Sequence, residues 1–273
     1  ATCSSVGGVH IESFDGRRFD FHGRCQYVFA KDKGWDLFTV LVENKECQTE
    51  GDTCIESATL IIGNVRDGNV IRFSQGNRIS MGQERMSIEL PYFGELFNIR
   101  KASGEYVQLN SVIGVKILWS GSTLMVTVDP GYVGNTHGLC GVYNGNLGDD
   151  FRTQQGIIVD NVGEFGNSWK VGGSMCPDVG TGPDIIRPCD LVTPRTNQAT
   201  ELCSIIKGAV FANCHAEEDP DHYFGTCRDD TCRCEDPGLS CFCDAVAFYS
   251  YLCMQKGIII PWRDSQELGG ICS

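Results

Sequence analysis

Sixteen cysteines among 273 residues are the most reactive groups of this chain. Their number is even, so every thiol has a possible partner, and such high cysteine usage is typical of chains that form disulfides in an oxidising compartment. Six cysteines lie before Pro177 and ten after it. The sequence therefore predicts a secreted protein whose second half depends most strongly on disulfides.

The segment Asn144–Asp150 (NGNLGDD) is the second group of residues that could do chemistry. It contains two amides and two carboxylates, and oxygen-rich loops of this kind supply the ligands that Ca²⁺ prefers. The loop is not an EF-hand, because no glutamate stands at the twelfth position. Taken alone, such a loop is more often a solvated turn. An acid–base pair formed by Asp149 and Asp150 is a further alternative.

The charge balance disfavours several classes of function. The chain has 22 Lys and Arg against 35 Asp and Glu, a net charge of −13. This charge disfavours binding to nucleic acid and to anionic lipid. No apolar run approaches the roughly 20 residues that a membrane-spanning helix needs. The chain begins at Ala1 without a signal peptide, as expected of a mature or excised fragment of a secreted protein.

The two halves have different patterns of apolar residues. Short β-branched runs about ten residues apart, bounded by turn residues, predict an antiparallel sandwich or barrel in the first half. In the second half a period near 3.6 predicts helices, and Asp219-Pro220 is a typical helix start. The predicted strands are 37–42, 58–62, 70–73, 86–90, 96–100, 106–109, 112–118 and 123–128, and the predicted helices include 197–213 and 243–256. The Gly- and Pro-containing string DVGTGPDIIRP lies between the halves.

Three strings carry a family resemblance: FDGRRFDF (14–21), GLCGVYNGNLGDDF (138–151) and CRCEDPGLSCFCDAVAFYSYLC (232–253). With this order and spacing, the chain resembles a von Willebrand type D domain followed by its eight-cysteine companion module. The likeness is closest to the third D assembly of von Willebrand factor and of gel-forming mucins. It implies an α+β protein, with an antiparallel β-sandwich type D domain over 1–178, a linker over 179–188 and a disulfide-rich helical module over 189–273.

The resemblance also implies a disulfide pairing. The implied pairs are Cys3–Cys140, Cys25–Cys176, Cys47–Cys54, Cys189–Cys232, Cys203–Cys227, Cys214–Cys253, Cys234–Cys241 and Cys243–Cys272. The family often has one further bond, from a cysteine after the CQYV strand to one that opens the string CGLCG. Here His137 stands at the second of these positions, and no cysteine lies between Cys25 and Cys47. Both partners are therefore missing together.

The resemblance favours calcium over a plain turn at the acidic loop. The implied ligands are the side chains of Asp15, Asn144, Asp149 and Asp150 and the carbonyl of Asn146. Val142 stands where the family usually has an amide. Valine has no side-chain oxygen, so either water completes the coordination or the affinity for calcium is lower.

The resemblance implies a structural function without catalysis. We expect a calcium-stabilised assembly module of a secreted, extracellular multidomain glycoprotein, mucin- or von Willebrand factor-like, that supports disulfide-linked multimerisation or matrix adhesion. Cys241, the first cysteine of CFCD, is the candidate intermolecular cysteine. The expected partners are other D-assembly modules, a second copy in a disulfide-linked homodimer, and extracellular glycoproteins, without nucleic acid and without membrane insertion.

Three alternatives compete with this interpretation. The first is an extracellular ligand-binding module, for example one that captures a growth factor. The second is a luciferase-like oxidase, since some secreted luciferases contain type D domains. The third is a zinc cluster formed by the four cysteines of CRCEDPGLSCFC. The C-x-C spacing and the oxidising context argue against zinc.

Overall fold

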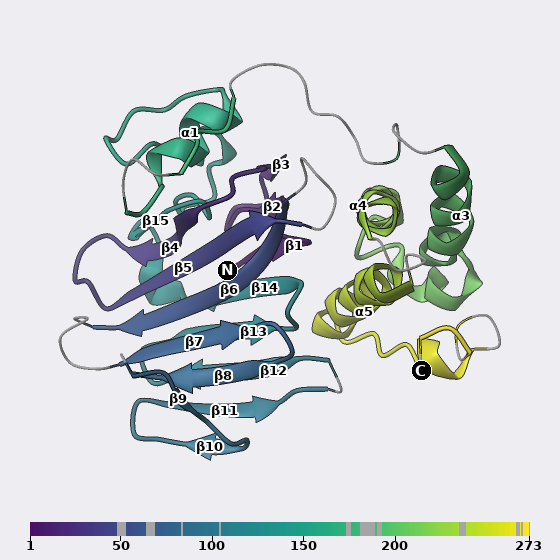
Figure 1. The fold of residues 1–273 in the computed structure, drawn as a ribbon, viewed down its shortest axis with the longest axis horizontal. Coiled ribbons are helices and arrows are strands. Elements are labelled where there is room, and N and C mark those ends of the chain that lie inside the picture. Colours follow the sequence, from purple (N-terminus) through teal and green to yellow (C-terminus); the bar gives the residue numbers. More distant parts are fainter. Residues whose placement is uncertain are drawn as a thin grey trace. The chain divides into compact units, whose positions relative to one another are not determined.

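The computed structural model describes residues 1–47, 53–63, 69–82, 84–103, 105–172, 176–180, 189, 193–234, 239–265, 268 and 270–272. The chain divides into two compact units, Ala1–Gly182 and Pro183–Ser273. The first unit contains the strands and the second is helical (Figure 1). Most of the expected linker, 181–188, lies outside the described residues.

Two antiparallel sheets build the described part of the first unit (Figure 1). One sheet has the order β10-β11-β12-β13-β14-β1-β2-β3, with the strands β1 (Thr2–Val6), β2 (His10–Glu12), β3 (Arg18–Asp20), β10 (Tyr92–Phe93), β11 (Phe97–Lys101), β12 (Val107–Ser111), β13 (Val115–Trp119) and β14 (Thr123–Val128). The other has the order β15-β4-β5-β6-β7-β8-β9, with the strands β4 (Gln26–Asp32), β5 (Phe38–Glu46), β6 (Thr53–Ile62), β7 (Val70–Ser74), β8 (Arg78–Met81), β9 (Met86–Ser87) and β15 (Thr136–His137).

The hydrophobic core of the first unit lies between these sheets. Along β5, buried residues alternate with more exposed ones, as expected when one face of a strand packs inward. Phe73 of β7 and Trp119 of β13 belong to different sheets, are fully buried and have ring centroids 6.5 Å apart. This packing confirms the β-sandwich, one of the two architectures that the short, regularly spaced runs predict.

Some strand boundaries differ from the sequence prediction. The run 112–118 begins with a turn, because Gly114 adopts a positive φ of 77° and the strand starts only at Val115. None of the predicted strands corresponds to β1, which nevertheless pairs with both β14 and β2. Its Ser4 and Ser5 are buried despite their polarity. A polar strand of this kind has no clear hydrophobic period, so only the pairing in the sheet identifies it.

The helical elements of the first unit are η2 (Pro130–Tyr132), η3 (Leu147–Asp149) and α1 (Val162–Ser168). Those of the second unit are α3 (Thr193–Cys203), η4 (Ser204–Lys207), η5 (Ala209–Cys214), α4 (Pro220–Arg233), α5 (Leu239–Gln255) and η6 (Trp262–Asp264). The start of α4 is as expected, since the Asp219 carboxylate accepts a hydrogen bond from the Asp221 N–H at 3.0 Å. The expected helix 197–213 is instead an α-helix followed by two 3₁₀ segments. Gly208, with extended backbone, separates these two segments. Among the described residues, no helix has the length and apolar character needed to cross a bilayer.

All sixteen cysteines are described residues, and each belongs to a disulfide. The first unit contains Cys3–Cys140, Cys25–Cys176 and Cys47–Cys54. The second contains Cys189–Cys232, Cys203–Cys227, Cys214–Cys253, Cys234–Cys241 and Cys243–Cys272. These are the pairs that the family resemblance implies. The four cysteines considered for zinc are distributed over three disulfides and have no thiolate to offer a metal.

Candidate calcium site

Two glycines shape the turn that leads into the acidic loop. Gly138 and Gly141 have positive φ angles of 118° and 71°. A Cβ at Gly138 would lie 2.7 Å from the backbone oxygen of Phe29, and one at Gly141 would lie 2.3 Å from the Asp150 carboxylate. Only glycine combines this backbone conformation with so close an approach. The turn therefore allows the backbone of Gly141 to lie directly against the Asp150 carboxylate.

The segment that follows β2 lies beside this turn, although it belongs to the beginning of the chain. The Phe14 N–H donates to the carbonyl of Cys140 at 3.0 Å. The disulfide Cys3–Cys140 joins β1 to the same turn. Residues more than 120 positions apart in the sequence are thus fixed side by side, as the proposed ligand set requires.

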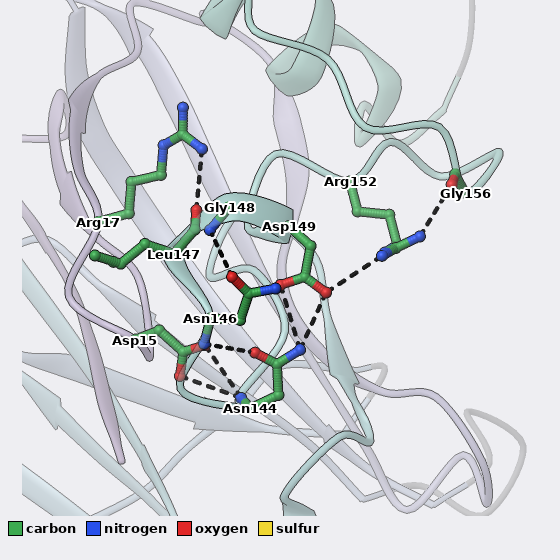
Figure 2. Close-up of polar contacts among 9 residues, drawn as sticks. All are labelled: Asp15, Arg17, Asn144, Asn146, Leu147, Gly148, Asp149, Arg152 and Gly156. Carbon is green, nitrogen blue, oxygen red and sulfur yellow. Dashed lines mark hydrogen bonds and ion pairs between the residues drawn. The ribbon is translucent and has the colours of Figure 1, made fainter.

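Asp15 organises the acidic loop (Figure 2). Its carboxylate accepts hydrogen bonds from the backbone N–H of Asn144 at 3.1 and 3.2 Å and from that of Asn146 at 2.9 Å. The amide oxygen of Asn144 accepts a second hydrogen bond from the Asn146 N–H at 2.8 Å. The structure thus brings Asp15 onto the loop that contains the other expected ligands.

Asp149 lies between an amide and a cation (Figure 2). Its carboxylate accepts a hydrogen bond from the Asn144 side-chain amide at 3.0 Å and pairs with Arg152 at 3.2 Å. Arg152 also donates to the carbonyl of Gly156 at 3.2 Å. A metal ion at Asp149 would therefore share this carboxylate with Arg152 or replace the guanidinium.

Asp150 is almost completely buried, at 1% exposure. One carboxylate oxygen, Oδ2, accepts a hydrogen bond from the Ser13 hydroxyl at 2.6 Å. The other, Oδ1, is buried and forms no hydrogen bond of regular geometry with a described residue, although the Val142 backbone lies close enough to the carboxylate to lower its pKa. The pKa of Asp150 is raised to about 6, chiefly by burial and also by the charges of Asp15 and Asp149, while hydrogen bonds from the Ser13 hydroxyl and the Val142 backbone oppose the shift. A cation bound to Oδ1 would stabilise the negative charge of this buried carboxylate.

The chemistry of this donor set suits a hard cation, because its members offer carboxylate and amide oxygens. The described residues nevertheless contain no group of three His, Cys, Asp or Glu side chains placed to hold a metal ion. The polar groups of the loop instead form the hydrogen bonds with one another that are given above. Val142 is 8% exposed and its side chain adds no oxygen. Calcium therefore remains a proposal.

Three residues around the loop were not anticipated from the sequence. Ser13 donates to Asp150, Arg152 pairs with Asp149, and Arg17 donates to the Leu147 carbonyl at 3.1 Å. The Arg17 guanidinium also lies 3.5 Å above the Phe151 ring. Arg17 lies within the first string that carries the family resemblance and Arg152 directly follows the second, but no spacing rule assigns these contacts to either arginine. Ser13 gives no signal in the sequence.

The candidate assembly cysteine lies at the beginning of α5. Cys241 is bonded to Cys234, which directly follows α4, and both residues are partly exposed. The residues 235–238 between them lie outside the described part of the chain. A partly exposed disulfide is open to exchange, because an attacking thiolate must reach one of its sulfurs.

Comparison with known proteins covers both units. Residues 3–157 match the von Willebrand factor type D domain model, and residues 202–268 match the C8 domain model. The chain is 35% identical to human otogelin over 266 residues, 34% identical to mouse mucin-2 over 269 and 35% identical to bovine von Willebrand factor over 265. Each alignment covers 96% of this chain but only 9%, 6% and 27% of the respective relative.

Proposed function

Since this chain belongs to the von Willebrand factor type D domain family and carries a C8 domain after its type D domain, we propose that it is a structural and assembly module of a secreted, mucin- or von Willebrand factor-like glycoprotein. The observation that carries this proposal is the agreement of both domain models, in order, with a chain whose sixteen cysteines are all paired. A covalently closed module of this kind suits a protein that works outside the cell.

The proposed module is stabilised by calcium. Asp15, Asn144, Asp149 and Asp150 would hold the ion through side-chain oxygens and Asn146 through its carbonyl. When bound, the ion would supply positive charge to three carboxylates and a partner for the vacant Asp150 Oδ1. Because Asp15 and the loop belong to distant parts of the sequence, calcium would join the segment after β2 to the turn at Gly141.

Assembly would proceed through Cys241. Because all sixteen cysteines of this chain are paired, the attacking thiolate must come from a partner chain that carries an unpaired cysteine or an opened disulfide. This thiolate would attack the sulfur of Cys241, and the Cys234–Cys241 bond would break with Cys234 leaving as a thiolate. No net oxidation accompanies this exchange. In the isolated chain no thiol is available to attack this bond, so spontaneous dimerisation should be slow.

Non-reducing gels of secreted variants test the assembly role. Cys234→Ala should free Cys241 and produce a dimer during oxidative secretion, whereas Cys234→Ala/Cys241→Ala should remain monomeric. Cys47→Ala, which frees Cys54 in the first unit, is the matched control for dimerisation through any unpaired cysteine. A monomeric Cys234→Ala protein with an alkylatable Cys241 would contradict the assembly role and favour the ligand-binding alternative.

A further inference from the structure

The first unit has a surface hollow of about 410 Å³ that contains none of the proposed calcium ligands. It is lined by the connection from β4 to β5, by the turn Val112–Gly114 and by residues near η2 (Pro130–Tyr132). Volumes of a few hundred cubic ångströms are typical of sites that enclose a ligand or one large side chain.

The charge in this hollow is negative. Asp32 is 1% exposed, and its carboxylate accepts hydrogen bonds from the backbone N–H of Gly34, Trp35 and Leu37 at 3.3, 2.8 and 3.1 Å. These three donors hold the carboxylate in place. The residues that line the hollow include no Lys, Arg or His.

Asp129 supplies a second carboxylate. It is exposed, and its side chain forms no hydrogen bond or ion pair with the residues that the structure describes. The Ala1 ammonium is within electrostatic range but donates its hydrogen bond to the Val128 carbonyl at 3.0 Å. Burial and then the charges of Asp32 and Asp129 raise the pKa of Tyr132, which lines the same hollow. The hollow is therefore a place where a positive charge is stabilised.

Apolar side chains with large exposed fractions accompany the carboxylates. Trp35 is 80% exposed, Val112 68% and Leu37 40%, and all three line the hollow. An indole is the best aromatic partner for a cation. Exposed apolar side chains gathered around a hollow are a common mark of a protein-binding surface.

We propose that this hollow binds an arginine side chain presented by an extended segment of a partner protein. The planar guanidinium can stack on an indole while it donates two hydrogen bonds to a carboxylate, a combination that lysine cannot provide. Asp129 is the exposed carboxylate and Trp35 the exposed indole. Apolar residues on either side of the arginine would cover Val112 and Leu37, which a small free amine would leave in water.

Fluorescence of Trp35 gives a selective test. The chain has four tryptophans, and the other three, Trp119, Trp169 and Trp262, are at most 3% exposed. Quenching by acrylamide therefore reports mainly on Trp35. The probe is acetyl-Val-Arg-Val-amide added to the full chain, with the Val-Gln-Val and Val-Glu-Val peptides and arginine amide as comparisons.

The arginine peptide should protect Trp35 saturably, and the glutamine and glutamate peptides should not. Asp129→Asn keeps the side-chain shape but removes the charge, so it should weaken protection roughly two- to fivefold, as for an exposed ion pair. Glu89→Gln, at an exposed acid outside the hollow, should leave the affinity unchanged. Unchanged melting temperatures of both variants would establish that each is folded.

Three results would overturn the proposal. The first is no protection by the arginine peptide at millimolar concentration. The second is equal protection by the glutamine peptide or an unchanged affinity of Asp129→Asn, because either would remove the cation from the interaction. The third is arginine amide binding as tightly as the peptide, which would assign the hollow to a small free amine.

Discussion

At the scale of single residues, Asp150 is the group on which the proposed calcium site depends most. Its carboxylate is buried, its Oδ1 forms no hydrogen bond of regular geometry with a described residue, and its pKa is raised to about 6 mainly by burial. A negative charge in such a place is costly unless a cation or a proton accompanies it. Calcium would remove this cost at neutral pH.

Removal of Asp150 should therefore remove the response to calcium. EGTA should lower the melting temperature of the natural sequence, and calcium at 100 times its Kd should restore about 2.7 kcal/mol of stability. Asp150→Ala should melt at the same temperature with and without calcium, whereas Glu89→Gln should keep the full response. Val142→Asn, which adds an amide oxygen, should tighten calcium binding in a calorimetric titration. Identical melting curves of the natural sequence in EGTA and in excess calcium would dispose of the site.

His137 is a second residue with an unusual environment. Its Nε2 is buried without a hydrogen-bond partner among the described residues, and its ring lies 5.2 Å from that of Trp169. Burial, followed by the nearby Lys31 and Lys33, lowers the pKa of His137 from its ordinary value of 6.5, although Asp32 and Asp36 oppose the shift. The folded protein therefore favours the neutral imidazole.

This shift predicts a loss of stability in mild acid. Between pH 6.5 and the lower pKa of folded His137, the unfolded chain binds a proton that the folded chain does not, so stability falls as the pH falls. His137→Gln cannot titrate and should show a flatter dependence of melting temperature on pH between 7.5 and 5. His215→Gln, in the second unit, is the matched control and should retain the slope of the natural sequence. An equal slope in all three proteins would show that His137 carries no such linkage.

At the scale of elements, the position of β1 links the sandwich to the acidic loop. The strand pairs with β14 and β2, and its Cys3 is bonded to Cys140, which is 137 positions later in the sequence. The carbonyl of Cys140 accepts the hydrogen bond from Phe14, next to Asp15. Strand, disulfide and loop therefore form one connected structure.

Loss of this disulfide should affect stability and calcium binding together. Cys3→Ala/Cys140→Ala should cost about 4–5 kcal/mol in the chain-entropy model and should weaken calcium binding, because the turn that positions the loop loses its anchor. Cys47→Ala/Cys54→Ala, with a separation of only 7 positions, should cost about 2 kcal/mol and leave the calcium affinity unchanged. Denaturant unfolding and calorimetric titration measure the two effects. An unchanged calcium affinity of Cys3→Ala/Cys140→Ala would refute the coupling.

At the scale of the whole molecule, the eight disulfides account for every cysteine. Ten of the sixteen cysteines lie in the second unit, Pro183–Ser273, where a small domain gains much of its stability from cross-links. Because every cysteine is paired within the chain, no thiol is available for bonds between chains. Assembly therefore requires that one internal bond be opened.

Counting the free thiols of the purified chain tests whether all eight disulfides are closed. Alkylation under denaturing but non-reducing conditions should modify no cysteine, and sixteen should become reactive after reduction. Peptide mapping should recover Cys234 and Cys241 as one linked pair. Substoichiometric alkylation of Cys241 without reduction would indicate that the bond is already partly open, and fast dimerisation would then be expected.

The sequence by itself determined the class of this protein and most of its elements. Short β-branched runs bounded by turn residues and spaced about ten residues apart predict an antiparallel sandwich or barrel, because strands of this length are joined by tight turns. The Asp219-Pro220 start of α4 is also local, since a carboxylate cap and a proline act within one turn of helix. The cysteine-containing strings indicate the family, because they place several cysteines at fixed distances from one another.

Only the tertiary structure decided which distant groups meet. The polar strand β1 has no hydrophobic period, so its place between β14 and β2 depends on pairing with residues over 100 positions away. The same is true of the hydrogen bond from Ser13 to Asp150, which joins residues 137 positions apart. The hollow beside Trp35 combines three segments of chain that are distant in the sequence. Contacts of this kind depend on the closure of long loops, which no local pattern encodes.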